Sequence, residues 1–230
     1  MYQYLQEELE QLKSKIIRMG SLVETQIGDS FRALFNGDIE LSEAVIQKDD
    51  EIDKFEIRID KHCQRIFALT QPVAYDLRLI MASLMINTDL ERMGDLAVSV
   101  SLKTKYLQDY VDLLHEMKID ELAGKVHAII RMSIDCFVNG DSDLAKEIIR
   151  VDREIDRLES EVFNMLTDRM KEDNEMIVPC SHILTLTRNI ERLADHAANI
   201  AEDVIFLIDA KIMKHTKDSP KDSHKGESQS

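Results

Sequence analysis

The sequence predicts an all-α fold made of two tandem, pseudo-symmetric three-helix bundles, six helices in all, followed by a disordered C-terminal tail. Composition is the first indication, because 230 residues include only seven Gly, three Pro and no Trp. Turn-forming residues are therefore scarce, whereas helix formers such as Leu, Met, Glu and Lys are common. The spacing of apolar residues and an internal repeat are the other two observations.

The first helix is predicted from apolar residues that recur every three or four positions. They are Leu5, Leu9, Leu12, Ile16, Met19, Val23, Ile27, Phe31 and Leu34. This spacing draws an apolar stripe along one side of a long helix. Asn36-Gly37-Asp38 should end it, since glycine suits a helix C-terminus and Asp38 can cap the helix that follows.

Two further helices complete the first bundle. The second carries an apolar stripe and ends before Gln71-Pro72; its stripe consists of Leu41, Val45, Ile52, Phe55, Ile59, Cys63 and Ile66. The third is expected from about Ala74 to Tyr106. An amphipathic helix needs partners to bury its stripe, so the three helices should form one bundle.

The second half of the chain repeats this pattern. Asn139-Gly140-Asp141 repeats Asn36-Gly37-Asp38 at an offset of 103, and nine of eighteen positions are identical between 36–53 and 139–156. Further on the offset becomes 100, so that 191–195 correspond to 91–95. Ile119, Leu122, Val126 and Ile129 restart the apolar stripe. We therefore expect domains at 1–110 and 111–213, and a disordered tail at 214–230, which lacks apolar periodicity.

The formal net charge of −15 excludes some partners. Such a chain is repelled by nucleic acid and by anionic lipid unless it carries a strong local basic patch, and no such patch stands out in the sequence. No apolar run approaches the roughly 20 residues of a membrane span, and the first residues do not resemble a signal peptide. We expect a cytoplasmic protein, without nucleic-acid binding or membrane insertion, whose three cysteines are buried and free.

Acidic residues form the most informative pattern. One helix carries Asp49, Asp53, Glu56 and Asp60, and its repeat keeps Asp152, Asp156 and Glu159 but has Phe163 in place of Asp60. The third helix of each bundle adds a pair, Glu91 with Asp95 and Glu191 with Asp195. Converging carboxylates repel each other, and hard cations such as Mg, Mn or Fe relieve the repulsion. Alternatively, these side chains are solvated or paired with Arg92 and Arg192.

Motifs for covalent catalysis are missing from the sequence. It has no phosphate-binding glycine loop, nucleophile elbow or dinucleotide fingerprint, so no organic cofactor is expected. Asp195 and His196 are adjacent and point about 100° apart on a helix, which argues against a catalytic dyad. The chain is therefore not expected to be an enzyme.

Three segments resemble the PhoU family of phosphate-uptake regulators, and the resemblance spans nearly everything from Leu5 to about Ala210. They are 71–78 (QPVAYDLR), 89–95 (DLERMGD) and 190–203 (IERLADHAANIAED). The resemblance implies a non-enzymatic negative regulator that restrains phosphate uptake and phosphate-starvation signalling. Its implied partners are the ATPase subunit of the phosphate ABC transporter and the sensor histidine kinase, reached at the inner face of the membrane. It also suggests a homodimer.

The family resemblance also implies metal sites, because some members bind iron or zinc clusters through paired acidic motifs. The matching positions are Asp49, Asp53, Glu91, Asp95, Asp152, Asp156, Glu191 and Asp195. Ser99 stands where the motif and the second repeat, at Asn199, carry Asn, so the first site is expected to hold its metal more weakly or differently. Oxygen ligands discriminate poorly among metals, which leaves iron, zinc, manganese and magnesium all open.

Two other hypotheses stay open at this point. The carboxylates could form the site of a metal-dependent hydrolase or oxidase in which a bound water is the nucleophile. The protein could instead be a metal-free helical adaptor, in which case the eight acidic residues would be replaceable by Gln or Lys without loss of function.

Overall fold

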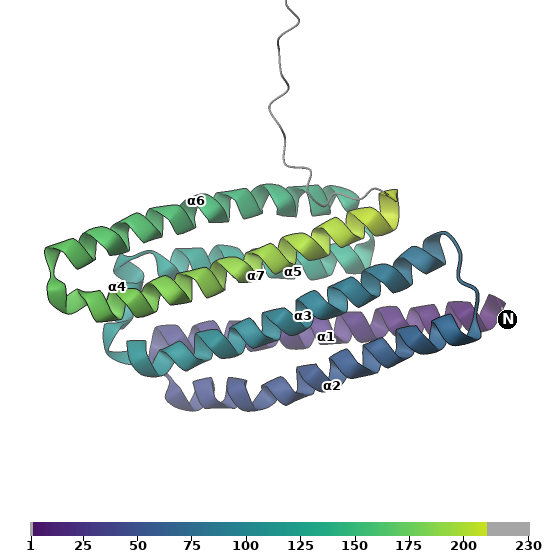
Figure 1. The fold of residues 1–230 in the computed structure, drawn as a ribbon, viewed down its shortest axis with the longest axis horizontal. Coiled ribbons are helices and arrows are strands. Elements are labelled where there is room, and N and C mark those ends of the chain that lie inside the picture. Colours follow the sequence, from purple (N-terminus) through teal and green to yellow (C-terminus); the bar gives the residue numbers. More distant parts are fainter. Residues whose placement is uncertain (1, 211–230) are drawn as a thin grey trace, which may run out of the picture.

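A computed structural model describes residues 2–210, which form helices joined by short connections (Figure 1). The elements are α1 (Tyr2–Asn36), α2 (Ile39–Leu69), α3 (Tyr75–Leu107), η1 (Gln108–Tyr110), α4 (Val111–Glu116), α5 (Ile119–Asn139), α6 (Ser142–Glu172), η2 (Asn174–Met176) and α7 (Ile177–Asp209). The six long helices predicted from the sequence are confirmed. The expected disordered tail, 214–230, lies outside the described residues.

The short elements α4, η1 and η2 were not predicted. They lie in the connections, where too few residues are available to show a period. Leu113 and Leu114 of α4 are nevertheless buried, so this connection contributes to the core.

The two predicted glycine turns have the expected geometry. Gly37 and Gly140 adopt φ values of 61° and 63°, which glycine reaches without the strain of a side chain. In the first turn, the Asp38 carboxylate accepts a hydrogen bond from the Leu41 amide at 2.9 Å. Asp141 caps α6 in the same way, accepting from two amides. These local devices fix where α2 and α6 begin.

Each half of the chain forms a three-helix layer, α1 to α3 and α5 to α7, as Figure 1 shows. The apolar stripes of both layers merge into one continuous core, and the most extensive contact between helices joins α3 to α7. The two bundles are therefore packed against each other rather than separated. Cys63, Cys136 and Cys180 are buried and free, as expected.

Polar and aromatic contacts mark the junction between α3 and α7. At one end the Arg78 Nε donates to the Leu207 carbonyl at 3.0 Å, and at the other the rings of Tyr106 and His182 stack with centroids 4.9 Å apart. Within residues 2–210, no helix has the length and apolar content needed to cross a lipid bilayer.

Candidate metal centres

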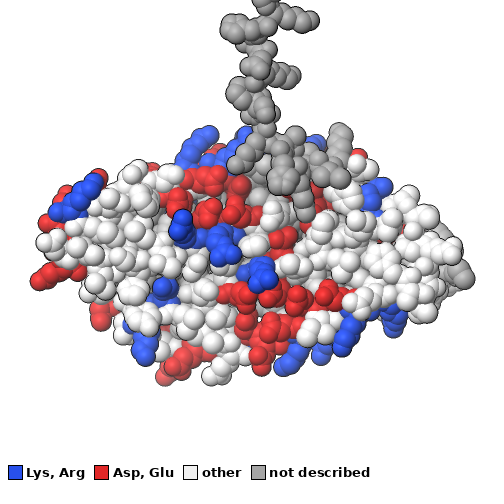
Figure 2. Space-filling view, in the orientation of Figure 1, with Lys and Arg blue, Asp and Glu red and all other residues white. Residues whose placement is uncertain are grey.

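The structure places the predicted acidic residues in two groups, one on each bundle. The first cluster consists of Asp49 and Asp53 on α2 with Glu91 and Asp95 on α3. The second cluster consists of Asp152 and Asp156 on α6 with Glu191 and Asp195 on α7. Figure 2 shows acidic side chains gathered over the middle of both layers, with basic side chains between the two groups. The repeat has therefore placed an acidic cluster on each bundle.

Electrostatic coupling shows that the carboxylates of α2 and α3 face each other in the first cluster. Burial raises the pKa of Asp49, a hydrogen bond from Gln26 opposes this rise, and the charges of Asp53 and Asp95 add to it. Burial likewise raises the pKa of Glu91, and Asp95 raises it further. The carboxylates of the two helices therefore lie within electrostatic range of one another.

Two neighbours stabilise the carboxylates of the first cluster, one by a hydrogen bond and one by its positive charge. Gln26 of α1 donates from Nε2 to Asp49 Oδ1 at 3.0 Å, and it is itself buried. Arg92 bridges the acidic pair on α3, with nitrogens 3.4 Å from Glu91 and 3.5 Å from Asp95. The first cluster is therefore partly compensated by the protein itself.

Gly94 allows α2 and α3 to approach each other beside the first cluster. A Cβ at this position would lie 3.2 Å from Asp49 Oδ1 and 3.4 Å from Gln26 Oε1. The corresponding residue of the second bundle is Ala194, so this part of the repeat has diverged. A side chain at position 94 would therefore require Asp49 and Gln26 to shift by a few tenths of an ångström.

The second cluster has less internal compensation. Burial raises the pKa of Asp152 to about 7, with further increases from Asp156 and Asp195. The pKa of Glu191 is also raised to about 7, first by burial and then by Asp195 and Asp156. Ile129 occupies the repeat position of Gln26, and an apolar side chain cannot donate to Asp152.

One oxygen of Asp152 is an orphaned acceptor. Oδ1 is buried and has no hydrogen-bond partner among the described residues. An unpaired buried carboxylate oxygen is unfavourable, and a cation is one of the ligands that would satisfy it. The oxygen donors of the second cluster are of the type that hard metal ions prefer, and Asp152 is more buried than the exposed Asp156 and Asp195.

The side chains as they lie are not gathered tightly enough to bind an ion. Across the described part of the chain, no three His, Cys, Asp or Glu side chains form a group that could hold a metal. Carboxylates from facing helices would have to converge by rotating about their side-chain bonds. The backbone brings the predicted residues together in each bundle, but final coordination geometry is not formed.

The flanking acidic residues behave differently in the two bundles. Asn87 of α3 donates to Asp60 Oδ1 at 2.9 Å and to the Glu56 carbonyl at 3.1 Å, so Asp60 is held by an amide. Phe163, the repeat equivalent of Asp60, is exposed. Asp60 and Phe163 therefore lie outside the acidic positions that the repeat preserves.

Sequence reasoning missed Gln26 and Asn87, which lie among the buried polar residues and contact acidic residues across helices. Gln26 falls beside the stripe residues Val23 and Ile27 of α1. The sequence offered one signal: Gln26 is a polar residue on an otherwise apolar side of α1. A buried polar group needs a hydrogen-bond partner, so its position predicts a contact with another helix. Which partner it meets depends on the rotation of α1 against α2.

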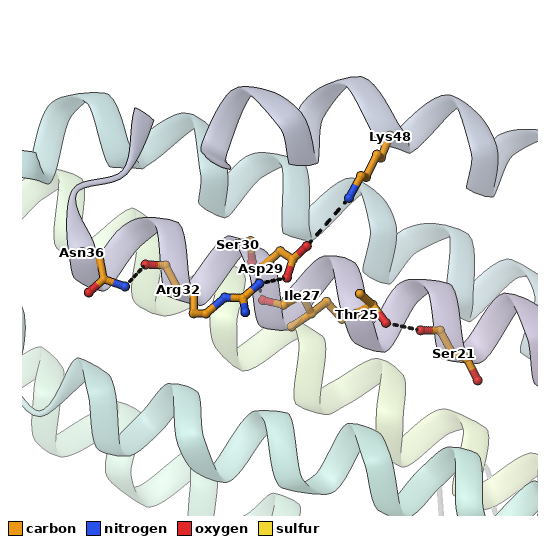
Figure 3. A network of polar contacts seen from close by, with 8 residues as sticks. All are labelled: Ser21, Thr25, Ile27, Asp29, Ser30, Arg32, Asn36 and Lys48. Carbon is orange, nitrogen blue, oxygen red and sulfur yellow. Dashed lines mark hydrogen bonds and ion pairs between the residues drawn. The ribbon is translucent and has the colours of Figure 1, made fainter. Parts of the chain in front are cut away.

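A groove lies between α1, α4 and α5, away from the acidic clusters. This groove has a volume of about 730 Å³ and includes Asp29, Arg32, Phe35, His115 and His127 in its lining. Figure 3 shows that Asp29 lies between Arg32 of α1 and Lys48 of α2, while Thr25 and Asn36 donate to carbonyls of their own helix. These side chains already have partners, within α1 for Thr25, Arg32 and Asn36 and across to Lys48 of α2 for Asp29, so we assign no site here.

Comparison with known proteins identifies relatives along almost the whole chain. The model of the PhoU domain matches twice, at residues 16–104 and 119–204, once in each bundle. A protein from Clostridium acetobutylicum, named phosphate-specific transport system accessory protein PhoU homolog, is 37% identical over 207 residues, covering 89% of this chain and 94% of the relative. A Pseudomonas aeruginosa protein of the same name is 35% identical, with coverage of 90% and 86%.

Solved structures agree with these matches. The crystal structure of PhoU from Pseudomonas aeruginosa superposes with a TM-score of 0.83 at 35% identity, covering 90% of this chain and 99% of that one. The phosphate transport system regulatory protein PhoU from Streptococcus pneumoniae gives the same TM-score at 26% identity, covering 90% and 98%. The six-helix arrangement is thus shared with experimentally determined structures.

Proposed function

The chain belongs to the PhoU family, and from this premise we propose that it is a non-enzymatic negative regulator of phosphate uptake and of phosphate-starvation signalling. Its relatives are named accessory proteins of the phosphate-specific transport system, which supports a role in regulating phosphate transport. We propose that it acts by docking onto the ATPase subunit of the phosphate ABC transporter and onto the sensor histidine kinase. Both contacts would take place at the inner face of the membrane.

The observation that carries this proposal is the pair of acidic clusters on one rigid helical scaffold. Asp152, Asp156, Glu191 and Asp195 would hold a metal ion in the second bundle, and the buried unpaired oxygen of Asp152 supports this assignment. Asp49, Asp53, Glu91 and Asp95 would hold another in the first. A bound divalent or trivalent ion, whether iron, zinc, manganese or magnesium, would cancel the mutual repulsion of the carboxylates.

The protein's own residues then determine how the docking surface is presented. The clusters lie on α2, α3, α6 and α7, whose buried stripes fix them in one core. A bound ion would draw together the carboxylates of two helices. It would therefore link the position of α2 to that of α3, and the position of α6 to that of α7. We propose that this coupling holds the surface in the conformation that partners recognise.

A metal-free adaptor is the second candidate, because the side chains do not form a ready coordination sphere in residues 2–210. In that case the clusters would act as acidic surface that recognises basic patches on partners. The two candidates make different predictions for the same variant, which permits a direct test.

The test compares the wild-type protein with a variant in which Asp53, Asp95, Asp156 and Asp195 are all Asn. Elemental analysis measures bound metal, and biolayer interferometry measures affinity for the purified ATPase subunit. The matched control changes four exposed acidic residues outside the clusters to their amides, which alters the net charge equally; these are Asp112, Glu121, Asp135 and Glu147.

Stoichiometric metal and docking that are both lost in the cluster variant, but retained in the control, would support metal-dependent docking. A metal-free wild type that still docks would support the adaptor. Absence of binding to both the ATPase subunit and the kinase would refute the docking mechanism.

A further inference from the structure

One surface of the first bundle has no equivalent in the second. Lys54, Arg58, Lys61 and Arg65 are all exposed on α2 and follow a spacing of four, three and four, so they lie along one side of the helix. On the same helix Asp49, Asp53, Glu56 and Asp60 lie roughly 140° away around its axis, at about 100° per residue, whereas the exposed Asp50 and Glu51 lie roughly 50° to either side of the row, one turn before Lys54. This row does not stand out in the sequence, because helical spacing separates its cations along the chain.

Arg18 of α1 extends the row of cations. Its guanidinium and that of Arg58 lie over the ring of Phe55, at 5.2 and 5.6 Å from the centroid. We call Arg18, Lys54, Arg58, Lys61 and Arg65 the basic row. Arg65 pairs with Glu8, but within residues 2–210 no carboxylate forms an ion pair with Lys54, Arg58 or Lys61. Most of this charge is therefore available to an external partner.

The basic row leads to an uncharged end of the bundle. From Ile66 to Tyr75 the chain has no charged residue, although 32% of all residues are charged. We call this segment the uncharged tip. Leu69, Val73 and Tyr75 are 57%, 69% and 47% exposed there, and Figure 2 shows an end of the molecule without charged side chains. Apolar side chains held in solvent in this way are typical of interaction sites.

The backbone at the start of the tip is set by the end of α2. Thr70 donates from its hydroxyl and its amide to the Ile66 carbonyl, at 2.7 and 2.9 Å, and so ends α2. The chain then turns back through Pro72 into α3. Tyr4 and Phe67, which are also exposed, lie on the adjoining ends of α1 and α2.

The second bundle does not preserve this surface, although it shares the fold. At the offset of 103, the four cations of α2 correspond to Arg157, Glu161, Asn164 and Asp168. At the offset of 100, Val73 and Tyr75 of the tip correspond to Asp173 and Glu175. Helix packing alone does not require the basic row or the apolar tip, since the other copy folds without them.

We propose that the basic row and the uncharged tip together bind the surface of an anionic phospholipid membrane. The cations would attract lipid phosphates, and Leu69, Val73 and Tyr75 would enter the interfacial layer, where aromatic and aliphatic side chains are favoured. A purely acidic protein surface would satisfy the basic row but would leave the apolar side chains of the tip exposed. The contact lies on the membrane surface, and it depends on neither metal binding nor the transporter.

The net charge would orient the protein on the membrane. With a net charge of −15, most of its surface is repelled by anionic lipid, so the cation-rich end of the first bundle is the part that can approach. The second bundle would then face away from the lipid. Its acidic cluster would remain accessible to protein partners.

Vesicle co-sedimentation of the purified full chain tests the proposal. Two kinds of vesicle are compared, phosphatidylcholine alone and a mixture of phosphatidylcholine with phosphatidylglycerol. We expect binding only to the mixture, weakening as salt is raised, because screening reduces the attraction. Reversing Lys54, Arg58 and Lys61 to Glu should reduce binding at least about tenfold, and Leu69→Ser with Val73→Ser should also weaken it.

The control reverses three exposed cations elsewhere, Lys125, Arg157 and Arg188, which changes the net charge equally. It should bind nearly as well as the wild type. Circular dichroism confirms that every variant remains helical. Failure of the wild type to bind the phosphatidylglycerol vesicles would overturn the proposal. Equal loss in the control would also overturn it, because it would show dependence on overall charge rather than on this surface.

Discussion

Asp89 of α3 and His196 of α7 join the two bundles, with Asp89 Oδ1 and His196 Nδ1 2.7 Å apart. Asn199 donates to the same carboxylate oxygen at 3.2 Å. The contact is half-buried and lies at the most extensive helix interface of the protein. His196 therefore serves the junction between bundles rather than a dyad with the adjacent Asp195.

His196→Leu should destabilise the protein by about 1 to 2 kcal/mol, because it leaves the half-buried Asp89 with only the amide of Asn199. The repeat suggests a compensating change, since Asp89 and His196 correspond to Asn189 and Leu96. Adding Asp89→Asn should recover most of the loss. Urea denaturation of the single and double variants measures this coupling, and simple additivity would argue against a direct interaction.

Asp152 should make stability depend on pH. Its pKa is about 7 in the folded protein against an ordinary value of 3.8, so the folded state holds the proton over a wider pH range than the unfolded state does. The contribution of this group to the free energy of unfolding therefore falls as pH rises from about 4 to about 7. Asp152→Asn should be more stable than the wild type by about 1 to 2 kcal/mol at pH 8.

At pH 4 the wild type and Asp152→Asn should differ little, because Asp152 is protonated in the folded protein. Thermal denaturation at both pH values, with a chelator present, gives the comparison. Glu154→Gln, an exposed change on the same helix, is the control. A constant stability difference between wild type and Asp152→Asn at the two pH values would contradict the raised pKa.

The two acidic clusters should differ in metal affinity. Gln26 and Arg92 already contact the first cluster, whereas Asp152 has an unpaired buried oxygen. In manganese titration calorimetry, Asp152→Asn should weaken the tighter binding event about tenfold or more, and Asp49→Asn should affect only a weaker one. Equal losses from the two changes would show that the clusters are equivalent.

Glu8 should be important for the stability of the first bundle. It is buried, its Oε2 lies 2.7 Å from His62 Nε2, and Arg65 also contacts it. Glu8→Ala should cost about 3 kcal/mol, because it leaves the buried His62 and the Arg65 guanidinium without their acceptor. Glu10→Ala, an exposed neighbour, should change the free energy of unfolding by less than about 0.5 kcal/mol.

The sequence was sufficient for features that are local along the chain. The period of the apolar residues predicted six helices, and Gly37 with Asp38 and Gly140 with Asp141 predicted two of the connections. The internal repeat predicted that equivalent acidic residues occur in both halves. These signals are readable because helical periodicity and capping depend on residues only a few positions apart.

The tertiary structure decided which side chains meet across helices. The contacts of Gln26 with Asp49 and of Asp89 with His196 join residues 23 and 107 positions apart. Such contacts depend on how each helix is rotated about its axis relative to its neighbours. The internal repeat of the sequence does not determine that rotation. The tertiary structure also decided that the two bundles share one core and that Arg18 of α1 joins the cations of α2. Both results follow from packing between helices.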